Sequence, residues 1–172
     1  MKHNVILTGF MGTGKTSLGK MLATKLGRPF VDIDKKIERA EHLSIPKIFE
    51  RYGEEHFREL ERAAVRELSS KRGLVIATGG GTIKDAENFR LLKSSGIVIC
   101  LTADPEEIFR RTARRGERPV LDSGGSERLA TIKKLLAERK EFYDRADYHV
   151  DTTDWSPLQI VEDICRYLRQ FR

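Results

Sequence analysis

A glycine-rich segment near the N-terminus has the residue types of a phosphate-binding loop. Residues 9–16, Gly-Phe-Met-Gly-Thr-Gly-Lys-Thr, match the pattern G-x-x-x-x-G-K-[ST] at every fixed position. The glycines would let backbone N–H groups point at phosphate oxygens, while Lys15 reaches the β- and γ-phosphates and the Thr16 hydroxyl ligates Mg²⁺. The alternative is a glycine-rich turn that binds nothing, which the Lys-Thr pair in register disfavours. The segment predicts a site for a nucleoside triphosphate.

Two carboxylates, Asp32 and Asp34, stand at the end of the next apolar run. Residues two apart in an extended chain project to the same side, so both could face the phosphates. One could hold Mg²⁺ through water while the other orients or deprotonates an attacking hydroxyl. Asp34 could equally cap a helix that begins at Lys35. The spacing alone does not decide between these two interpretations of Asp34.

Three consecutive glycines, Gly79, Gly80 and Gly81, follow a third apolar run. Such a run permits close approach of the backbone to a ligand and leaves N–H groups to donate to an anion or a hydroxyl. A structural turn is the alternative, although three glycines carry an entropic cost that a simple turn does not require. A Walker B strand would end in Asp, whereas this one ends in Thr78.

Two arginines could bind a substrate carboxylate. Arg58 lies one helical turn before Glu61, which would hold the guanidinium in place for a bidentate pair. A solvated salt bridge is the alternative, and such a bridge contributes little to stability. Arg139 is a second arginine with the same two interpretations. The four histidines have no spacing suited to a metal site or a catalytic triad.

These residues need a scaffold, and the alternation of apolar β-branched runs with helical patterns predicts one. It is an α/β fold with a parallel sheet covered by helices on both faces. Caps at Ser44, Asp104 and Ser156 support three helix starts. Strands are expected at residues 5–7, 30–33, 74–77, 97–101 and 148–150, and helices at 15–26, 34–41, 45–52, 54–69, 86–93, 105–113, 127–146 and 157–171.

Composition limits the classes of function. The chain has 172 residues, enough for one domain, with 39% hydrophobic and 34% charged residues. Its net charge of +6 suits an enzyme that holds a polyanionic nucleotide, and the basic residues alternate with acids, so no nucleic-acid partner is expected. No apolar run approaches membrane-spanning length and no signal peptide is visible, so a cytoplasmic protein without a membrane partner is expected.

Taken together, these segments resemble the shikimate kinase family along nearly the whole chain. The matching residues, in family order, are the loop at 9–16, residues 30–34 with Ile37 and Glu38, Ile45 with Ile48 and Phe49, Gly53-Glu54 with Phe57, Arg58 and Glu61, residues 78–81, Arg118-Pro119, and Arg139 with Tyr143.

The resemblance implies ATP-dependent phosphorylation of the 3-hydroxyl of shikimate to shikimate 3-phosphate, in the pathway to chorismate and aromatic amino acids. It also implies a three-layer P-loop kinase fold whose central five-stranded parallel sheet has the order 2-3-1-4-5. The chain would be one domain over residues 1–172, with a helical substrate-binding subdomain at about 34–68 and a lid at about 115–126. One Mg²⁺ per subunit, ATP as co-substrate and a monomeric state are expected.

The resemblance also assigns roles to residues. Lys15, Asp34 and Arg118 would be catalytic, Arg118 meeting the transferring phosphate from the lid. Thr16 and, through water, Asp32 would serve Mg²⁺. The ATP site would comprise Gly12, Thr13, Gly14, Lys15, Thr16, Ser17, Arg111, Arg118 and Trp155, with Arg111 stacked on adenine. The shikimate site would comprise Asp34, Arg58, Gly79, Gly80, Gly81 and Arg139.

Two other functions stay open on the residues alone. A kinase for another small hydroxy acid, such as gluconate, would need the same loop and a similar pair of arginines. A non-catalytic nucleotide-dependent switch would need the loop and not the arginines. The strand end at Thr78 and the lid-like Arg118 disfavour the second alternative, and the absence of a guanine-reading Asn-Lys-x-Asp segment disfavours a GTPase switch in particular.

Overall fold

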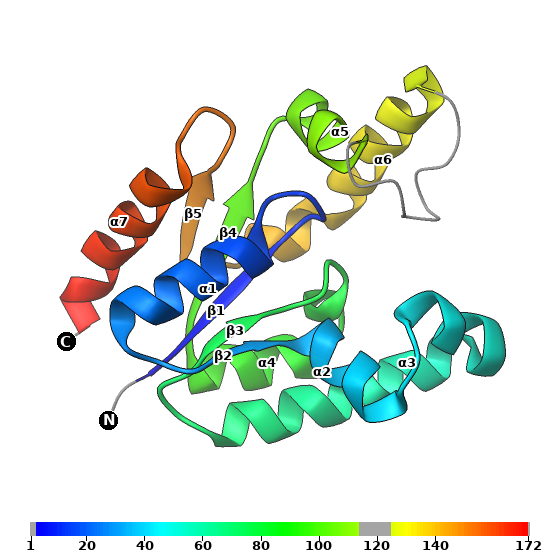
Figure 1. Ribbon diagram of the computed structural model, residues 1–172, viewed down its shortest axis with the longest axis horizontal. Helices are drawn as coiled ribbons and strands as arrows, with labels where there is room; N and C mark the ends of the chain where they lie inside the picture. Colours follow the sequence, from blue (N-terminus) through cyan, green and yellow to red (C-terminus); the bar gives the residue numbers. More distant parts are fainter. Residues whose placement is uncertain (1–2, 114–124, 172) are drawn as a thin grey trace.

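The computed structural model describes residues 3–113 and 125–171 and is built on a five-stranded parallel sheet (Figure 1). Every neighbouring pair of strands runs parallel, in the order β2-β3-β1-β4-β5, which confirms the expected topology. Its strands are β1 (Asn4–Gly9), β2 (Phe30–Asp32), β3 (Val75–Ala77), β4 (Gly96–Thr102) and β5 (Tyr148–Asp151).

Helices connect the strands, and most lie where the apolar periodicity predicts them. The two expected helices at 45–52 and 54–69 are one element, α3, whose helical geometry is broken at Gly53 with φ 83° and ψ 168°. The long helices are α1 (Lys15–Leu26), α2 (Ile33–Glu41), α3 (Ile45–Ser70), α4 (Ala86–Ser95), α5 (Pro105–Ala113), α6 (Gly125–Tyr143) and α7 (Pro157–Leu168), and the short 3-10 turns are η1 (Thr82–Lys84) and η3 (Arg169–Phe171).

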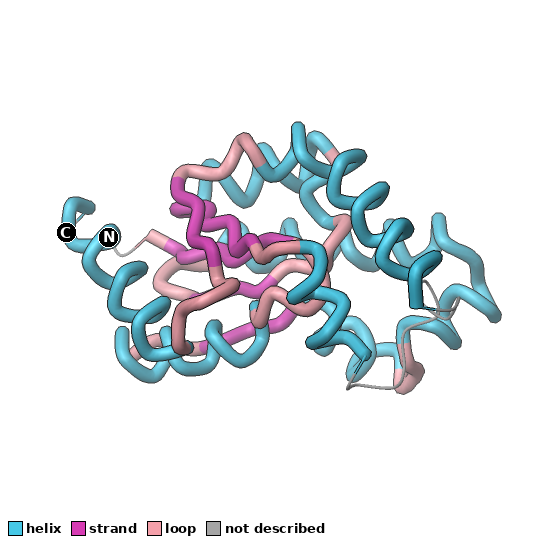
Figure 2. The backbone as a smooth tube through the Cα atoms, turned by 90° about the horizontal axis from the view of Figure 1, so that it is seen from above, coloured by secondary structure: helices cyan, strands magenta, loops and turns pink. Residues whose placement is uncertain are grey.

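The sheet is buried on both faces because successive side chains of its strands enter opposite halves of the core. In β1, Ile6 packs in one apolar cluster, with α3 and α4, while Val5 and Leu7 pack in the other, with α1 and α7. Figure 2 shows the strands enclosed between helices on either side. None of the helices in the described part of the chain is both long enough and apolar enough to cross a bilayer.

The helix caps differ in part from the expected ones. Ser156 begins α7 with a full capping box to Gln159, as its position predicts. Ser44 stands at the N-terminus of α3, yet its side chain makes no capping bond, and the Ile45 N–H donates instead to Glu38 Oε1 at 3.1 Å. Asp32 caps α2 by accepting from the Lys35 N–H at 3.1 Å. The capping alternative for Asp34 is therefore wrong.

The open edge of the sheet at β2 is lined with cations. A groove of about 680 Å³ runs beside Phe30, Val31 and Asp32, and its rim carries Lys20, Lys35, Lys36, Arg39 and Lys71. Charged side chains, lysine above all, prevent another chain from pairing with an exposed strand edge. Two of these cations, Lys36 and Lys71, pair with Glu67 in the same groove, so the short edge strand that directly precedes α2 is flanked by charged side chains.

Candidate active site

The glycine-rich loop joins β1 to α1 and presents the N-terminus of α1 to a cavity. Gly14, the residue before α1, has φ 93°, a left-handed conformation that glycine adopts without steric cost. The Thr13 hydroxyl closes the loop by donating to the Phe10 carbonyl at 2.7 Å. The Lys15 ammonium donates to the carbonyls of Gly9 at 2.7 Å and Phe10 at 2.9 Å, which places its charge over the loop.

The cavity beside this loop has a volume of about 170 Å³ and two unlike walls. One wall is the loop with the first turn of α1, and the other comes from the carboxyl ends of β2 and β3. Its lining includes Gly12, Gly14, Lys15, Thr16, Ser17, Asp32, Asp34, Thr78, Gly79 and Gly80. The predicted loop residues and both aspartates are thus together, except that Thr13 lines an adjoining cavity instead. Backbone N–H groups at a helix N-terminus and one ammonium suit a phosphate chain.

Asp32 and Thr16 form the polar corner of this cavity. The Thr16 hydroxyl donates to Asp32 Oδ2 at 2.6 Å, while Asp32 Oδ1 caps α2. Magnesium prefers hard oxygen ligands and is bound by one or two protein groups, its other positions being filled by water and substrate phosphates. A hydroxyl beside a carboxylate, next to a phosphate cavity, fits that donor set. Across residues 3–113 and 125–171, His, Cys, Asp and Glu form no group of three that could hold a metal alone.

Asp34 lines the same cavity, but its backbone is helical and not extended as expected. The expectation of an extended Asp32–Asp34 segment is wrong, because the helix begins at Ile33 and Asp34 lies in its first turn. Its Oδ1 atom is buried and has no hydrogen-bond partner in the described structure. Burial, then the nearby charges of Asp32 and Glu61, raise the pKa of Asp34 to about 6, although Lys15 acts in the opposite direction. A buried carboxyl oxygen without a partner suits a ligand hydroxyl.

The three consecutive glycines each lie against a different predicted substrate residue. A Cβ on Gly79 would meet Asp34 Oδ1 at 2.8 Å, and a Cβ on Gly80 would meet Arg139 Nη1 at 2.9 Å. A Cβ on Gly81 would meet Arg58 Nη2 at 3.2 Å. A side chain at any of these three positions would displace the charged end of its neighbour. The turn therefore gathers one carboxylate and two guanidinium groups from three separate helices around a bare backbone.

Both arginines are held by buried groups. Arg58 Nη1 donates to Glu61 Oε1 at 2.8 Å, and the Glu61 side chain is only 1% exposed. The interpretation of this pair as a solvated surface bridge is therefore wrong. The guanidinium of Arg139 lies over the Phe10 ring, 5.2 Å from its centroid. On the same helix, the Tyr143 hydroxyl donates to the Gly80 carbonyl at 2.9 Å and ties α6 to the glycine turn.

A second cavity, of about 390 Å³, adjoins the loop on its other side. It shares Gly12, Gly14 and Ser17 with the first cavity and continues to Arg111 and Trp155. Trp155, the sole tryptophan of the chain, has 48% of its surface exposed. A cavity with apolar and aromatic walls next to a phosphate site suits a nucleotide base.

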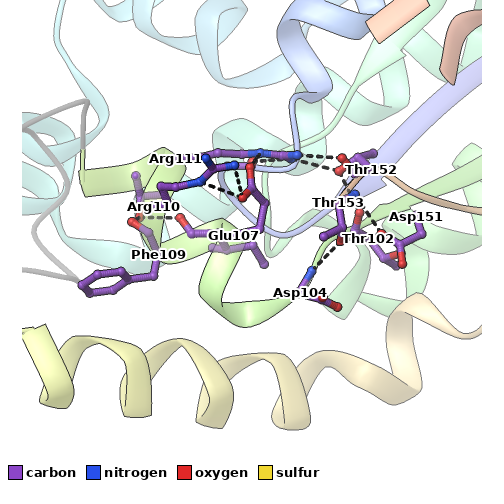
Figure 3. Close-up of polar contacts among 12 residues, drawn as sticks. Thr102, Asp104, Glu107, Phe109, Arg110, Arg111, Asp151, Thr152 and Thr153 are labelled. Atoms are coloured by element: carbon purple, nitrogen blue, oxygen red, sulfur yellow. Dashed lines mark hydrogen bonds and ion pairs between the residues drawn. The ribbon is translucent and has the colours of Figure 1, made fainter. Parts of the chain in front are cut away.

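The guanidinium of Arg111 is fixed by a network of polar contacts (Figure 3). Its Nε donates to Glu107 Oε1 at 2.7 Å, Nη1 to Thr152 Oγ1 at 2.9 Å, and Nη2 to the Thr152 carbonyl at 2.6 Å. Nη1 also lies 3.3 Å from the Gly12 carbonyl of the loop. Because protein acceptors take up the edge of the guanidinium, its planar face is the part that can stack on a base.

Sequence reasoning missed two supporting residues, and one residue that it did predict lies outside the described part of the chain. Thr152 holds Arg111, and Thr82 donates to Glu61 Oε2 at 2.7 Å; neither threonine belongs to a recognisable motif, although Thr82 directly follows the glycines. Arg118 and nearly all of the expected lid lie outside the described residues.

Comparison with known proteins identifies the family of this chain. The family model described as shikimate kinase matches residues 11–169. A shikimate kinase of Pelotomaculum thermopropionicum is 46% identical over 97% of this chain and 96% of its own length. The structure of a shikimate kinase from Acinetobacter baumannii in complex with shikimate has a TM-score of 0.92 and 37% identity, covering 100% of this chain and 96% of that one.

A gluconokinase from Sinorhizobium meliloti is also similar in structure, with a TM-score of 0.61 over 98% of this chain and 93% of that one. At 17% identity, this likeness extends to the fold alone. The extensive match in sequence, the sheet order and the matching loop lead to one assignment: this chain belongs to the shikimate kinase family.

Proposed function

We propose that this chain transfers the γ-phosphoryl group of ATP to the 3-hydroxyl of shikimate. The observation that carries the proposal is the glycine turn, where Gly79, Gly80 and Gly81 adjoin Asp34, Arg139 and Arg58 in that order. Shikimate is a small ring with one carboxylate and three hydroxyls. Around the turn, the guanidinium groups of Arg58 and Arg139 can bind a carboxylate, and the buried carboxyl of Asp34 can bind a hydroxyl. The cavity beside the phosphate-binding loop adjoins them.

The two cavities divide the substrates between them. In the proposal, the base of ATP stacks on Arg111 near Trp155, and its phosphates follow the loop into the smaller cavity. The carboxylate of shikimate binds Arg58 and Arg139, and its ring rests on the glycine backbone. Phosphoryl transfer depends mainly on positioning and on neutralising charge, so holding both substrates at this junction supplies most of the catalysis.

Asp34 and Lys15 act at the reacting atoms. In its ionised form, Asp34 accepts a hydrogen bond from the reacting hydroxyl and orients it toward the phosphorus, and it can take the proton as the new bond forms. Lys15 leaves the loop carbonyls to meet the β- and γ-phosphates. Arg118 is proposed to meet the transferring phosphate, on the strength of the family resemblance alone.

Mg²⁺ is part of the proposal because Thr16 and Asp32 supply the oxygen donors that it prefers. When bound, the ion neutralises charge on the β- and γ-phosphates. Asp32 is held in place for this role by the Lys35 N–H, and the Thr16 hydroxyl is already directed at the carboxylate. Both residues belong to the rigid ends of regular elements, which keeps the donor pair in position.

The test is a coupled assay of ADP release with shikimate, gluconate and nucleoside monophosphates as separate acceptors. We expect ADP release with shikimate, and a product that is heavier by one phosphate group on mass spectrometry. Turnover with gluconate but not with shikimate would indicate a different hydroxy-acid kinase. ATP hydrolysis that no acceptor stimulates would refute kinase function.

Chelation of Mg²⁺ with EDTA should abolish turnover, and added Mg²⁺ should restore it.

The remaining features of the proposal concern organisation. Residues 34–68, which include most of α2 and most of α3, would form the substrate-binding subdomain, and residues 115–126 the lid. We propose a cytoplasmic location because the reaction consumes ATP, and a monomeric state because the sequence shows no long apolar surface stripe. Sedimentation equilibrium of the full chain tests the monomer directly.

A further inference from the structure

The buried carboxylate of Glu61 holds Arg58, the arginine proposed to bind the substrate carboxylate, and it accepts hydrogen bonds from two different donors. Oε1 accepts from Arg58 Nη1 at 2.8 Å, while Oε2 accepts from the Thr82 hydroxyl at 2.7 Å. Glu61 is 1% exposed and Thr82 is fully buried. A buried carboxylate needs donors at both oxygens, since an oxygen without one retains the cost of its lost hydration.

Thr82 is itself fixed in the glycine turn. It begins η1 directly after Gly81, and its N–H donates to the Gly79 carbonyl at 3.3 Å. Its own carbonyl accepts from Asn88 Nδ2 on α4 at 3.2 Å. The hydroxyl of Thr82 therefore connects the glycine turn to α3, on which Glu61 and Arg58 lie.

This contact determines how Glu61 holds Arg58. Because Thr82 occupies Oε2, Glu61 binds the guanidinium through one oxygen and one nitrogen. The guanidinium of Arg58 lies beside Gly81 at the turn, and its Nη2, which Glu61 does not take, donates to the exposed Glu54 at 3.4 Å. Carboxylates pair with guanidinium groups most strongly through two parallel hydrogen bonds. Without a donor from Thr82, Oε2 of Glu61 would turn toward Arg58 and compete for Nη2.

We propose that Thr82 is a positioning residue for recognition of the substrate carboxylate. Its hydroxyl keeps Glu61 from taking both Nη groups of Arg58, and so keeps one edge of the guanidinium directed at the acid group of the substrate. The inference rests on the proposed function, because it takes Arg58 as the group that binds the shikimate carboxylate. It adds a determinant of acid specificity that does not touch the substrate.

The test compares two substrates that differ in charge. Thr82→Val removes the hydroxyl and keeps the shape, and steady-state kinetics are measured with shikimate and with its neutral methyl ester. We expect the KM for shikimate to rise about tenfold, with kcat and the KM for ATP nearly unchanged. The ester has no carboxylate for Arg58, so its kcat/KM should stay near the wild-type value and the acid-to-ester ratio should fall about tenfold.

Three further variants separate positioning from folding. Thr82→Ser restores the hydroxyl and should restore the acid-to-ester ratio. In an Arg58→Ala background, Thr82→Val should change the ratio no further, because the group that Thr82 acts through is gone. Thr24→Val, an exposed threonine on α1, is the matched control and should behave as wild type. If Thr82→Val does not fold, as judged by circular dichroism and thermal unfolding, Thr82→Ala removes the same hydroxyl with less bulk.

An unchanged acid-to-ester ratio in the folded hydroxyl-free variant would overturn the inference. So would an equal loss of activity on acid and ester, since that pattern describes general damage to the fold. These outcomes differ from failure of the proposed function, in which the wild-type protein itself does not phosphorylate shikimate.

Discussion

Replacing Asp34 by Asn should inactivate the enzyme and change how its stability depends on pH. Asp34 lies where the reacting hydroxyl is proposed to bind, and its buried Oδ1 has no partner in the described structure. Asn keeps the shape and can still accept a hydrogen bond, but it cannot ionise or take a proton. We therefore expect loss of most phosphoryl transfer with nucleotide binding retained.

The stability effect follows from the pKa of Asp34. In the folded protein burial raises it from 3.8 to about 6, so between these values the native state binds more proton than the unfolded state. The contribution of Asp34 to the stability of the wild-type protein is then fully present below about pH 4 and is lost as the pH rises through about 6. The whole difference corresponds to about 3 kcal/mol, of which about 2 kcal/mol falls between pH 4 and pH 7. The Asn variant has no ionisable group at this position, so its free energy of unfolding does not include this pH-dependent decrease.

The assay is urea unfolding of both proteins at several pH values, without nucleotide or metal, followed by far-ultraviolet circular dichroism. The free energy of unfolding of Asp34→Asn minus that of wild type should increase by about 2 kcal/mol from pH 4 to pH 7. Because the comparison uses the change in this difference between the two pH values, any pH-independent cost of burying the amide cancels. Asp154→Asn removes an exposed carboxylate and is the control.

A difference for Asp34→Asn that stays flat across this pH range would refute the reasoning. It would mean that Asp34 is already as easily ionised in the folded protein as in the unfolded chain. Normal turnover by the variant would separately remove Asp34 from the proposed mechanism.

Other substitutions test the two substrate sites independently. Arg58→Ala should raise the KM for shikimate roughly a hundredfold by removing one partner of a charge pair, and an unchanged KM would contradict its role with the carboxylate. Gly80→Ala places a Cβ 2.9 Å from Arg139 Nη1, so it should raise the KM for shikimate while sparing that for ATP; equal effects on both would argue against a substrate-specific wall. Arg111→Lys should raise the KM for ATP about tenfold, because an ammonium offers no planar face, and a change confined to shikimate would contradict the base site. ADP alone should alter the fluorescence of Trp155, the sole tryptophan, whereas shikimate alone should alter it little if the base binds beside it.

Local sequence was sufficient for the elements and for the phosphate site. The loop residues are contiguous, and their function depends on backbone geometry that glycine and the following helix impose locally. Strand and helix positions follow from apolar periodicity, so the alternation that predicts a parallel sheet is confirmed by the order β2-β3-β1-β4-β5. The prediction of the shikimate site rested on the family resemblance, since no local sequence pattern relates Arg58 to Arg139.

Local sequence was insufficient where the outcome depended on the residue at which a helix begins, or on which side chains the packing of helices buries. Asp34 and Asp32 compete for one helix cap, and the chain turns into α2 at Ile33, which gives the cap to Asp32 and leaves Asp34 facing the cavity. The Arg58–Glu61 pair has the spacing of a surface bridge, and only the packing of α3 buries Glu61.

The sequence by itself predicted a site for a phosphate chain, because the eight residues of the loop are adjacent in the chain. Only the tertiary structure decided how the second site is assembled, because its members come from α2, α3 and α6. They meet at one glycine turn, where the absence of side chains lets Asp34, Arg139 and Arg58 approach the backbone. Burial then sets the chemistry of that site: it raises the pKa of Asp34 and makes Glu61 depend on Thr82 for its second hydrogen bond.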